Sequence, residues 1–291
     1  MTLRLSENLF GFDEPDSTGQ YVFRTALEAF VIISTCYLAW TWGFYTLRNS
    51  EVVLPLAFAR IVDISFMFGN SYPIGNAVLI SVLSIIGFAK MSRWAYSVSF
   101  ILLVLQYSAR FSQGEIPHSA NLIGMALLGF AIGALLFSDD VLRSKFGMGF
   151  NYFFLGAAYL SAGISKLVAT GITWPDGRHL WMWIHEKAVD EIARTGVVQL
   201  NAVQEISLES VSVSTFFLAF GLIAELGAFL IWYKRTRVFI VWLIFFMHIG
   251  IYLTMDITFK LSMLEMILLG IPIAYLTDRW IEKKNLRKLA V

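Results

Sequence analysis

The stretch RVFIVWLIFFMHIGIYLTM, residues 237–255, decides the fold class of this chain. After its first arginine it holds no charged residue, and a helix of roughly 20 such residues crosses the hydrocarbon core of a bilayer. Similar apolar runs recur along the sequence, and the candidate spans are 25–47, 73–90, 92–110, 119–138, 149–168, 212–233, 237–255 and 260–277. They predict an all-α, polytopic integral membrane protein with eight transmembrane helices, or nine if residues 52–69 also span.

The composition of the whole chain agrees with this fold class. The 291 residues are 57% hydrophobic even without their 21 glycines, 15% are charged, and the mean hydropathy is +0.68. A typical soluble domain is about 45–50% apolar with glycine counted and about 25% charged. These values exclude a disordered chain, a coiled coil and most soluble enzyme classes. The net charge of +1 argues against nucleic acid as a partner, and the single cysteine, Cys36, excludes an intrachain disulfide.

Basic residues suggest how the chain is organised and oriented. We expect an N-terminal tail (1–24), one transmembrane domain (25–277) and a basic tail (278–291). The positive-inside rule places this last tail in the cytoplasm. The loop 169–211, the longest between candidate spans, then faces outward. Residues 52–69 are apolar enough to span but contain two charges, and the loop charges do not decide whether they do.

The long loop contains a predicted amphipathic helix, RHLWMWIHEKAVDEIART (178–195). Leu180, Ile184, Ala188 and Ile192 recur every four residues, which places them on one helix face. We expect this helix to lie on the outer membrane surface, as an interfacial helix or a lid. A plain amphipathic connector explains the same pattern.

Several ionisable residues fall within or at the ends of the predicted spans, where a charge costs roughly 2.5–3.5 kcal/mol at the bilayer centre. They are Lys166, His118, His248, Asp256, Glu225 and Glu265. A snorkelling lysine, a histidine at a helix start and interhelical hydrogen bonds are the alternative explanations. All but Glu225 project to the outer half of the bilayer, which predicts one polar cavity open to the outside. We expect no metal, because His185–Glu186 begins an HExxH pattern in which Val189 replaces the second histidine.

One motif resembles a known family. The segment YLSAGISKL (159–167), followed by WPDG (174–177), resembles the vitamin K-dependent gamma-carboxylase-like membrane proteins, also called the horizontally transferred transmembrane (HTTM) domain. The likeness continues at His118, in GLIAELGAFLIW (221–232) and in the histidine-bearing span, and covers about residues 100–270.

The resemblance implies a quinol-dependent oxidoreductase or carboxylase-type enzyme. In that family a lysine deprotonates a reduced naphthoquinone, which is oxidised to an epoxide. This role carries over to Lys166, and an active-site position carries over to His118. His248 and Trp174 match motif positions, and we add Glu225, Asp256 and Glu265 as candidate quinone- or substrate-binding residues. The resemblance is to short prokaryotic members, which implies the cytoplasmic membrane with the site facing outward.

Two other functions fit the same sequence. The chain lacks the large lumenal part of the carboxylase, so it is alternatively a non-catalytic subunit or scaffold of a larger membrane complex. It is also compatible with a factor for maturation or export of a small secreted peptide. The expected partners are therefore membrane lipids, a quinone, and either a peptide or other membrane subunits.

Overall fold

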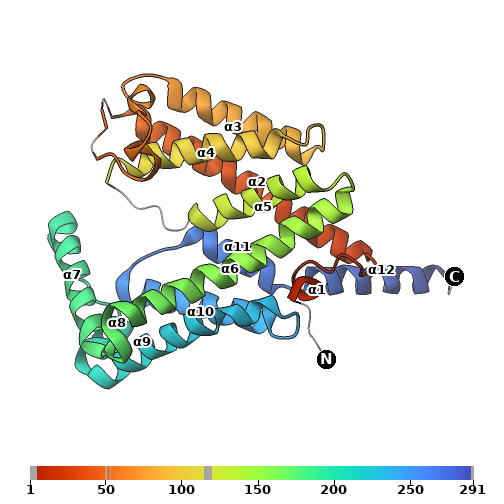
Figure 1. Ribbon diagram of the computed structural model, residues 1–291. Helices are drawn as coiled ribbons and strands as arrows, with labels where there is room; N and C mark the ends of the chain where they lie inside the picture. Colours follow the sequence, from red (N-terminus) through yellow and green to blue (C-terminus); the bar gives the residue numbers. More distant parts are fainter. Residues whose placement is uncertain (1–4, 50, 53, 115–119, 290–291) are drawn as a thin grey trace. The chain divides into compact units, whose positions relative to one another are not determined.

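The structure is a computed structural model that describes residues 5–49, 51–52, 54–114 and 120–289, and these residues contain helices and no strand (Figure 1). Four helical segments are long and apolar enough to cross a membrane, with bounds Thr18–Leu47, Asp140–Thr173, Val211–Trp232 and Arg237–Met255. A fifth results if Lys260–Gly270 and the helix after it form one span. This architecture is consistent with an integral membrane protein.

The helices fall close to the predicted spans. Up to the long loop they are α1 (Leu5–Leu9), α2 (Thr18–Leu47), η1 (Ala57–Arg60), η2 (Ser65–Met67), α3 (Tyr72–Phe88), α4 (Ala95–Phe111), α5 (Ala120–Leu136) and α6 (Asp140–Thr170). The remainder are η3 (Gly171–Thr173), α7 (Gly177–Thr195), α8 (Ala202–Glu209), α9 (Val211–Leu226), η4 (Gly227–Trp232), α10 (Arg237–Met255), α11 (Lys260–Gly270) and α12 (Ile273–Leu289). The η elements are short 3-10 helices.

Fewer of the described helices are long and apolar enough to cross a membrane than the sequence predicts. α3, α4 and α5 have 17 residues each. At 1.5 Å per residue such a helix is about 26 Å long, a little short of a hydrocarbon core of about 30 Å, and about 17 residues is the lower end of the range for a spanning helix. The predicted span 260–277 is interrupted, because α11 ends at Gly270 and Pro272 precedes α12. By length and composition, the described residues therefore contain four helices able to cross a membrane, or five if the bent pair is one span, and the eight spans remain a prediction.

Residues 52–69 do not form a ninth helix in the part of the chain that is described. The segment contains only η1 and η2, and the Asp63 carboxylate accepts a hydrogen bond from the Ser65 amide (2.9 Å), which turns the chain. Ile64, Met67 and Phe68 pack with Ala109 of α4 in a small core. The segment thus lies against the end of α4.

Residue contacts divide the chain into two compact units. Unit 1 comprises Met1–Phe154 and Ile271–Val291, and unit 2 comprises Leu155–Gly270, so that α6 continues from one into the other. The sequence predicted one transmembrane domain over 25–277. We describe each unit by itself.

In unit 1, α2 packs against α3, α4, α5 and α12 (Figure 1). Polar side chains pair between these helices. The Asn76 amide donates to Gln106 Oε1 (2.7 Å), and the hydroxyls of Ser84 and Ser99 are 2.8 Å apart. Buried polar groups in a membrane protein need such partners, because lipid supplies none.

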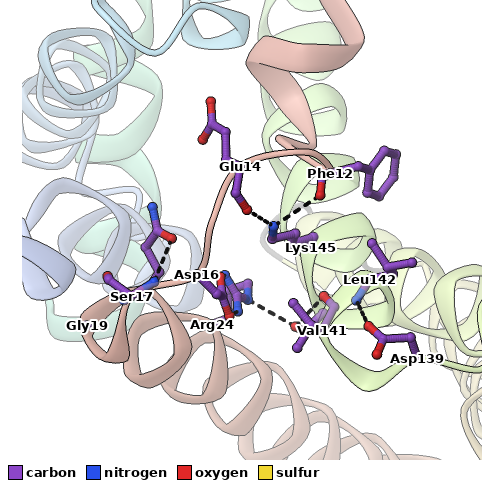
Figure 2. A network of polar contacts seen from close by, with 12 residues as sticks. Phe12, Glu14, Asp16, Ser17, Gly19, Arg24, Asp139, Val141, Leu142 and Lys145 are labelled. Atoms are coloured by element: carbon purple, nitrogen blue, oxygen red, sulfur yellow. Dashed lines mark hydrogen bonds and ion pairs between the residues drawn. The ribbon is translucent and has the colours of Figure 1, made fainter.

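The segment before α2 is tied to unit 1 by the polar contacts in Figure 2, although the sequence predicted a tail over 1–24. Arg24 forms a two-pronged ion pair with Asp16. The Lys145 ammonium donates to the carbonyl of Glu14 (2.7 Å). Ser17 caps α2, which begins at Thr18 rather than near residue 25.

α12 contacts the amino-terminal end of α2. The Asp278 carboxylate accepts from the Ser17 hydroxyl (2.6 Å) and from the Gly19 amide (2.7 Å). A Cβ atom on Gly19 would lie 2.0 Å from the carbonyl oxygen of Ala274, so only glycine allows this approach of α2 and α12. The predicted basic tail 278–291 is helical as far as Leu289.

In unit 2, α7 packs against α9, and α10 packs against α9 and α11. The predicted helix over 178–195 is confirmed as α7. Leu180 and Ile184 are buried in a core with Leu218, whereas Ile192 is half exposed. The start of α7 lies very close to α9. A Cβ on Gly177 would lie 2.2 Å from the Val211 carbonyl oxygen, so this position requires glycine. The position of α7 on a membrane surface remains a prediction.

Candidate functional site

The candidate site is a cavity of about 270 Å³ within unit 2. Its wall is formed by the end of α6, the segment after it, and parts of α7, α9 and α10. Most of the lining side chains are aliphatic or aromatic. Lys166 and Glu225 are the two charged side chains among the described residues that line it. The volume is close to the lower end of the range of small-molecule sites, about 300–1,000 Å³.

Lys166 and Glu225 form an ion pair at the cavity wall. The Lys166 ammonium donates to Glu225 Oε1. The Lys166 side chain is 31% exposed and the Glu225 side chain 6%. Glu225 Oε2 is buried without a hydrogen-bond partner among the described residues. The two helices approach closely because Gly163 has no side chain, since a Cβ there would lie 3.1 Å from the Glu225 Cβ.

Trp174 covers the lysine. The Lys166 Nζ lies 4.6 Å from the centroid of the Trp174 ring, within the range of a cation–π interaction. Trp183 of α7 packs beside it, with ring centroids 6.0 Å apart. The Trp174 carbonyl accepts a 2.8 Å hydrogen bond from His179 Nδ1, which fixes the chain at this point. The cavity therefore presents aromatic faces next to the charged pair.

His248 forms a second polar contact in unit 2. It is buried on α10, and its Nε2 lies 2.6 Å from the Tyr159 hydroxyl. Its ring packs on Phe259, at 4.6 Å between centroids, and Phe259 lines the cavity. His248 Nδ1 is buried with no hydrogen-bond partner among the described residues. His248 and Tyr159 thus lie behind the cavity wall rather than in it.

The other two acidic candidates, Glu265 and Asp256, do not line the cavity of Lys166 and Glu225. Glu265 is fully buried on α11. Asp256 ends α10 in a left-handed conformation (φ 53°) and is exposed. It lines a different cavity of about 230 Å³, with charged residues of α7. The sequence predicted that Asp256 and Lys166 share one polar cavity, but the structure places Asp256 at a different cavity.

The remaining sequence candidate, His118, lies outside the described residues, which omit 115–119. In the described part of the chain, no group of three or more His, Cys, Asp and Glu side chains is placed to hold a metal ion.

Tyr159 is not among the site residues that the sequence predicts, although the sequence carries a signal for it. Residues 159 and 166 are seven positions apart on α6, so they lie on the same helix face two turns apart. The pairing of Lys166 with Glu225 was also not predicted, because it depends on how α6 and α9 pack.

At the entrance to α7, Asp176 caps the helix. Its carboxylate accepts from the Arg178 amide (3.0 Å) and pairs with the Arg178 guanidinium. The hydrogen bonds from Arg178 lower the pKa of Asp176 from 3.8 to about 2.

Comparison with protein-family models, curated proteins and solved structures finds no match for this chain.

Proposed function

We propose that this protein is a membrane enzyme in which the Lys166–Glu225 pair exchanges a proton with a small apolar substrate in the unit 2 cavity. The observation that carries the proposal is a lysine–glutamate pair at the wall of an otherwise apolar cavity. A buried ion pair is often replaceable by apolar residues without loss of stability, so packing alone does not call for one here. An intramembrane charge is by default a functional candidate.

The pair can hold a variable number of protons. As an ammonium and a carboxylate it carries one transferable proton, and it can accept a second one at Glu225. A shift of the shared proton from Lys166 to Glu225 leaves a neutral amine, and a neutral amine is a general base. Because Glu225 Oε2 has no partner among the described residues, it is available to accept a hydrogen bond from a substrate hydroxyl.

The substrate that fits best is a reduced naphthoquinone, in line with the resemblance of YLSAGISKL to the carboxylase-like family. Trp174 and Trp183 offer aromatic faces for a flat ring, and Glu225 offers an acceptor for its hydroxyl. When bound, the reduced naphthoquinone would be oxidised by dioxygen, with one oxygen atom entering the epoxide and the other leaving as water. The residues of this chain then contribute the proton acceptor, the aromatic wall and exclusion of water.

Loop charges support an outward-facing site with the basic C-terminal residues in the cytoplasm. The resemblance to short prokaryotic members of the carboxylase-like family supports a prokaryotic cytoplasmic membrane. A peptide or lipid acting as a second substrate is part of the same proposal.

The test is epoxide formation by the purified protein in lipid nanodiscs. Phylloquinol is supplied under air, and the epoxide is measured by mass spectrometry. Wild-type protein is expected to form epoxide, and Lys166→Met to form it at least about 100-fold more slowly, since loss of a general base typically costs that much. Lys260→Met is the matched control, because Lys260 is an exposed lysine of the same unit.

A second variant tests the cavity without touching the ion pair. Gly250 lines the cavity, and a Cβ on it would meet no atom within 4 Å. Gly250→Leu is expected to fill the cavity and block turnover. Gly227→Leu is the control and should leave turnover unchanged, because a Cβ there also meets no atom within 4 Å but Gly227 does not line this cavity. Equal rates for wild type and Lys166→Met would refute the role of the pair. No epoxide from the wild type would refute the quinol enzyme and favour the scaffold.

A further inference from the structure

Unit 1 contains a second cavity, of about 350 Å³. Its wall comes from α2, η1, α4, α5 and the part of α6 that belongs to unit 1. Five aromatic side chains line it, and they are Trp42, Phe58, Phe100, Tyr107 and Phe154. None of its residues belongs to the unit 2 cavity, so an inference drawn from it does not rest on the proposed function.

The lining excludes a charged ligand group. Among the described residues that line this cavity, none carries a charge, and the polar ones are Tyr107, Ser108 and Asn121. A carboxylate or phosphate would lose its hydration there without gaining a cation, and burying an unpaired charge is very costly. The cavity therefore suits an uncharged molecule with a flat or branched apolar body, which the aromatic side chains contact.

Ser108 is the candidate polar anchor of this cavity. It is 1% exposed, it lines the cavity, and its hydroxyl is buried without a hydrogen-bond partner among the described residues. Thr35 and Ser97 also have unpartnered hydroxyls but do not line this cavity. The buried hydroxyls of Ser84 and Ser99 bond to each other instead. Most buried polar groups find a partner, so the Ser108 hydroxyl leaves a hydrogen bond that a molecule in the cavity can complete.

We propose that this cavity binds a lipophilic alcohol or ketone, with its aromatic or isoprenoid body among the aromatic side chains and its single oxygen hydrogen-bonded to Ser108. This is a binding site additional to the Lys166–Glu225 cavity. Because no charged side chain lines its described wall, the cavity selects against charged lipids.

The structure offers a variant that fills the cavity without a clash. Gly124 lines the cavity on α5, and a Cβ on it would meet no atom within 4 Å. Gly75 on α3 has the same open surroundings but does not line the cavity. Replacing glycine inside a helix with leucine favours the helix. Gly124→Leu and Gly75→Leu are thus a matched pair of variants that we expect to fold.

The experiment is photolabelling of the full chain in nanodiscs with 4-(trifluoromethyl-diazirinyl)benzyl alcohol, an uncharged aryl alcohol. Labelled residues are located by mass spectrometry. We expect labels on α4 and α5 in wild type and Gly75→Leu, and at least five-fold less in Gly124→Leu. The benzoic acid form of the same photoprobe should label these helices far less, because it is charged.

Ser108→Ala tests the anchor separately, through competition of the label by unlabelled benzyl alcohol. A neutral hydrogen bond contributes about 0.5–1.5 kcal/mol, so the competitor should bind about 2- to 12-fold more weakly. Equal labelling of all three proteins at α4 and α5, or equal labelling by the acid probe, would show bulk partition and overturn the site. Unchanged competition in Ser108→Ala would overturn the anchor. None of these results bears on epoxide formation.

Discussion

Removing Lys166 and removing Glu225 should lower the free energy of unfolding by different amounts. Removing one partner from a fully buried ion pair costs about 3–5 kcal/mol, because the other charge stays buried. Here the lysine side chain is 31% exposed and the glutamate side chain 6%. In Glu225→Gln the remaining ammonium can turn towards water, and we expect a loss of about 1–2 kcal/mol. In Lys166→Met the carboxylate has no such route, and we expect a loss of about 3 kcal/mol.

The assay is a double-mutant cycle on the free energy of unfolding, measured by SDS titration in mixed micelles. If the double variant loses no more stability than Glu225→Gln alone, the coupling free energy between the two side chains is about 3 kcal/mol. If the structure around Glu225 relaxes partly in Lys166→Met, the coupling free energy is about 2 kcal/mol. The exposed pair Lys187–Asp190, at 3.1 Å with side chains 39% and 67% exposed, is the control. Such a pair contributes about 0.3–0.5 kcal/mol. A coupling for Lys166–Glu225 no larger than the control, or a larger loss for Glu225→Gln than for Lys166→Met, would refute the reasoning.

Three further predictions concern the fold around the two cavities. Asn76→Leu removes a buried interhelical hydrogen bond of unit 1 and should cost about 1 kcal/mol in SDS unfolding; an unchanged midpoint would contradict the contact. Gly177→Ala forces a methyl group against the Val211 carbonyl, so hydrogen exchange in α7 should accelerate, whereas Gly227→Ala, which meets open space, should leave it unchanged. The pKa of Asp176 is about 2 in the folded state and 3.8 ordinarily, so its stabilisation of α7 is complete above about pH 4 and is lost as the pH falls towards 2. Protection factors of α7 that stay constant over this window would refute that contribution.

The positions of the helices were largely predictable, whereas their ends were not. Long apolar runs locate α2, α6, α9 and α10 because a membrane helix satisfies its own backbone groups. The break before Pro272 was not predicted, since residues 260–277 look continuous in hydropathy. Residues 52–69 have the composition of a span but turn at Asp63, which hydropathy does not register.

Some individual residues of the candidate site were predictable, but its geometry was not. Lys166, Glu225 and Trp174 stand out in sequence, and the structure brings them together. Asp256 was placed with them because it is near the outer end of a span. The left-handed turn that ends α10 instead leaves Asp256 exposed and directs it to another cavity. Side-chain direction at a helix end depends on backbone conformation, which spacing does not encode.

The discontinuity of unit 1 has a consequence for biosynthesis. α2 emerges from the ribosome early, yet Asp278 of α12, which bonds Ser17 and Gly19, is translated only after all of unit 2. During that interval the amino-terminal end of α2 lacks those hydrogen bonds and its packing against Ala274. Unit 2 is contiguous in sequence and can pack while the nascent chain is still tethered. Unit 1 can close only once α12 has been delivered.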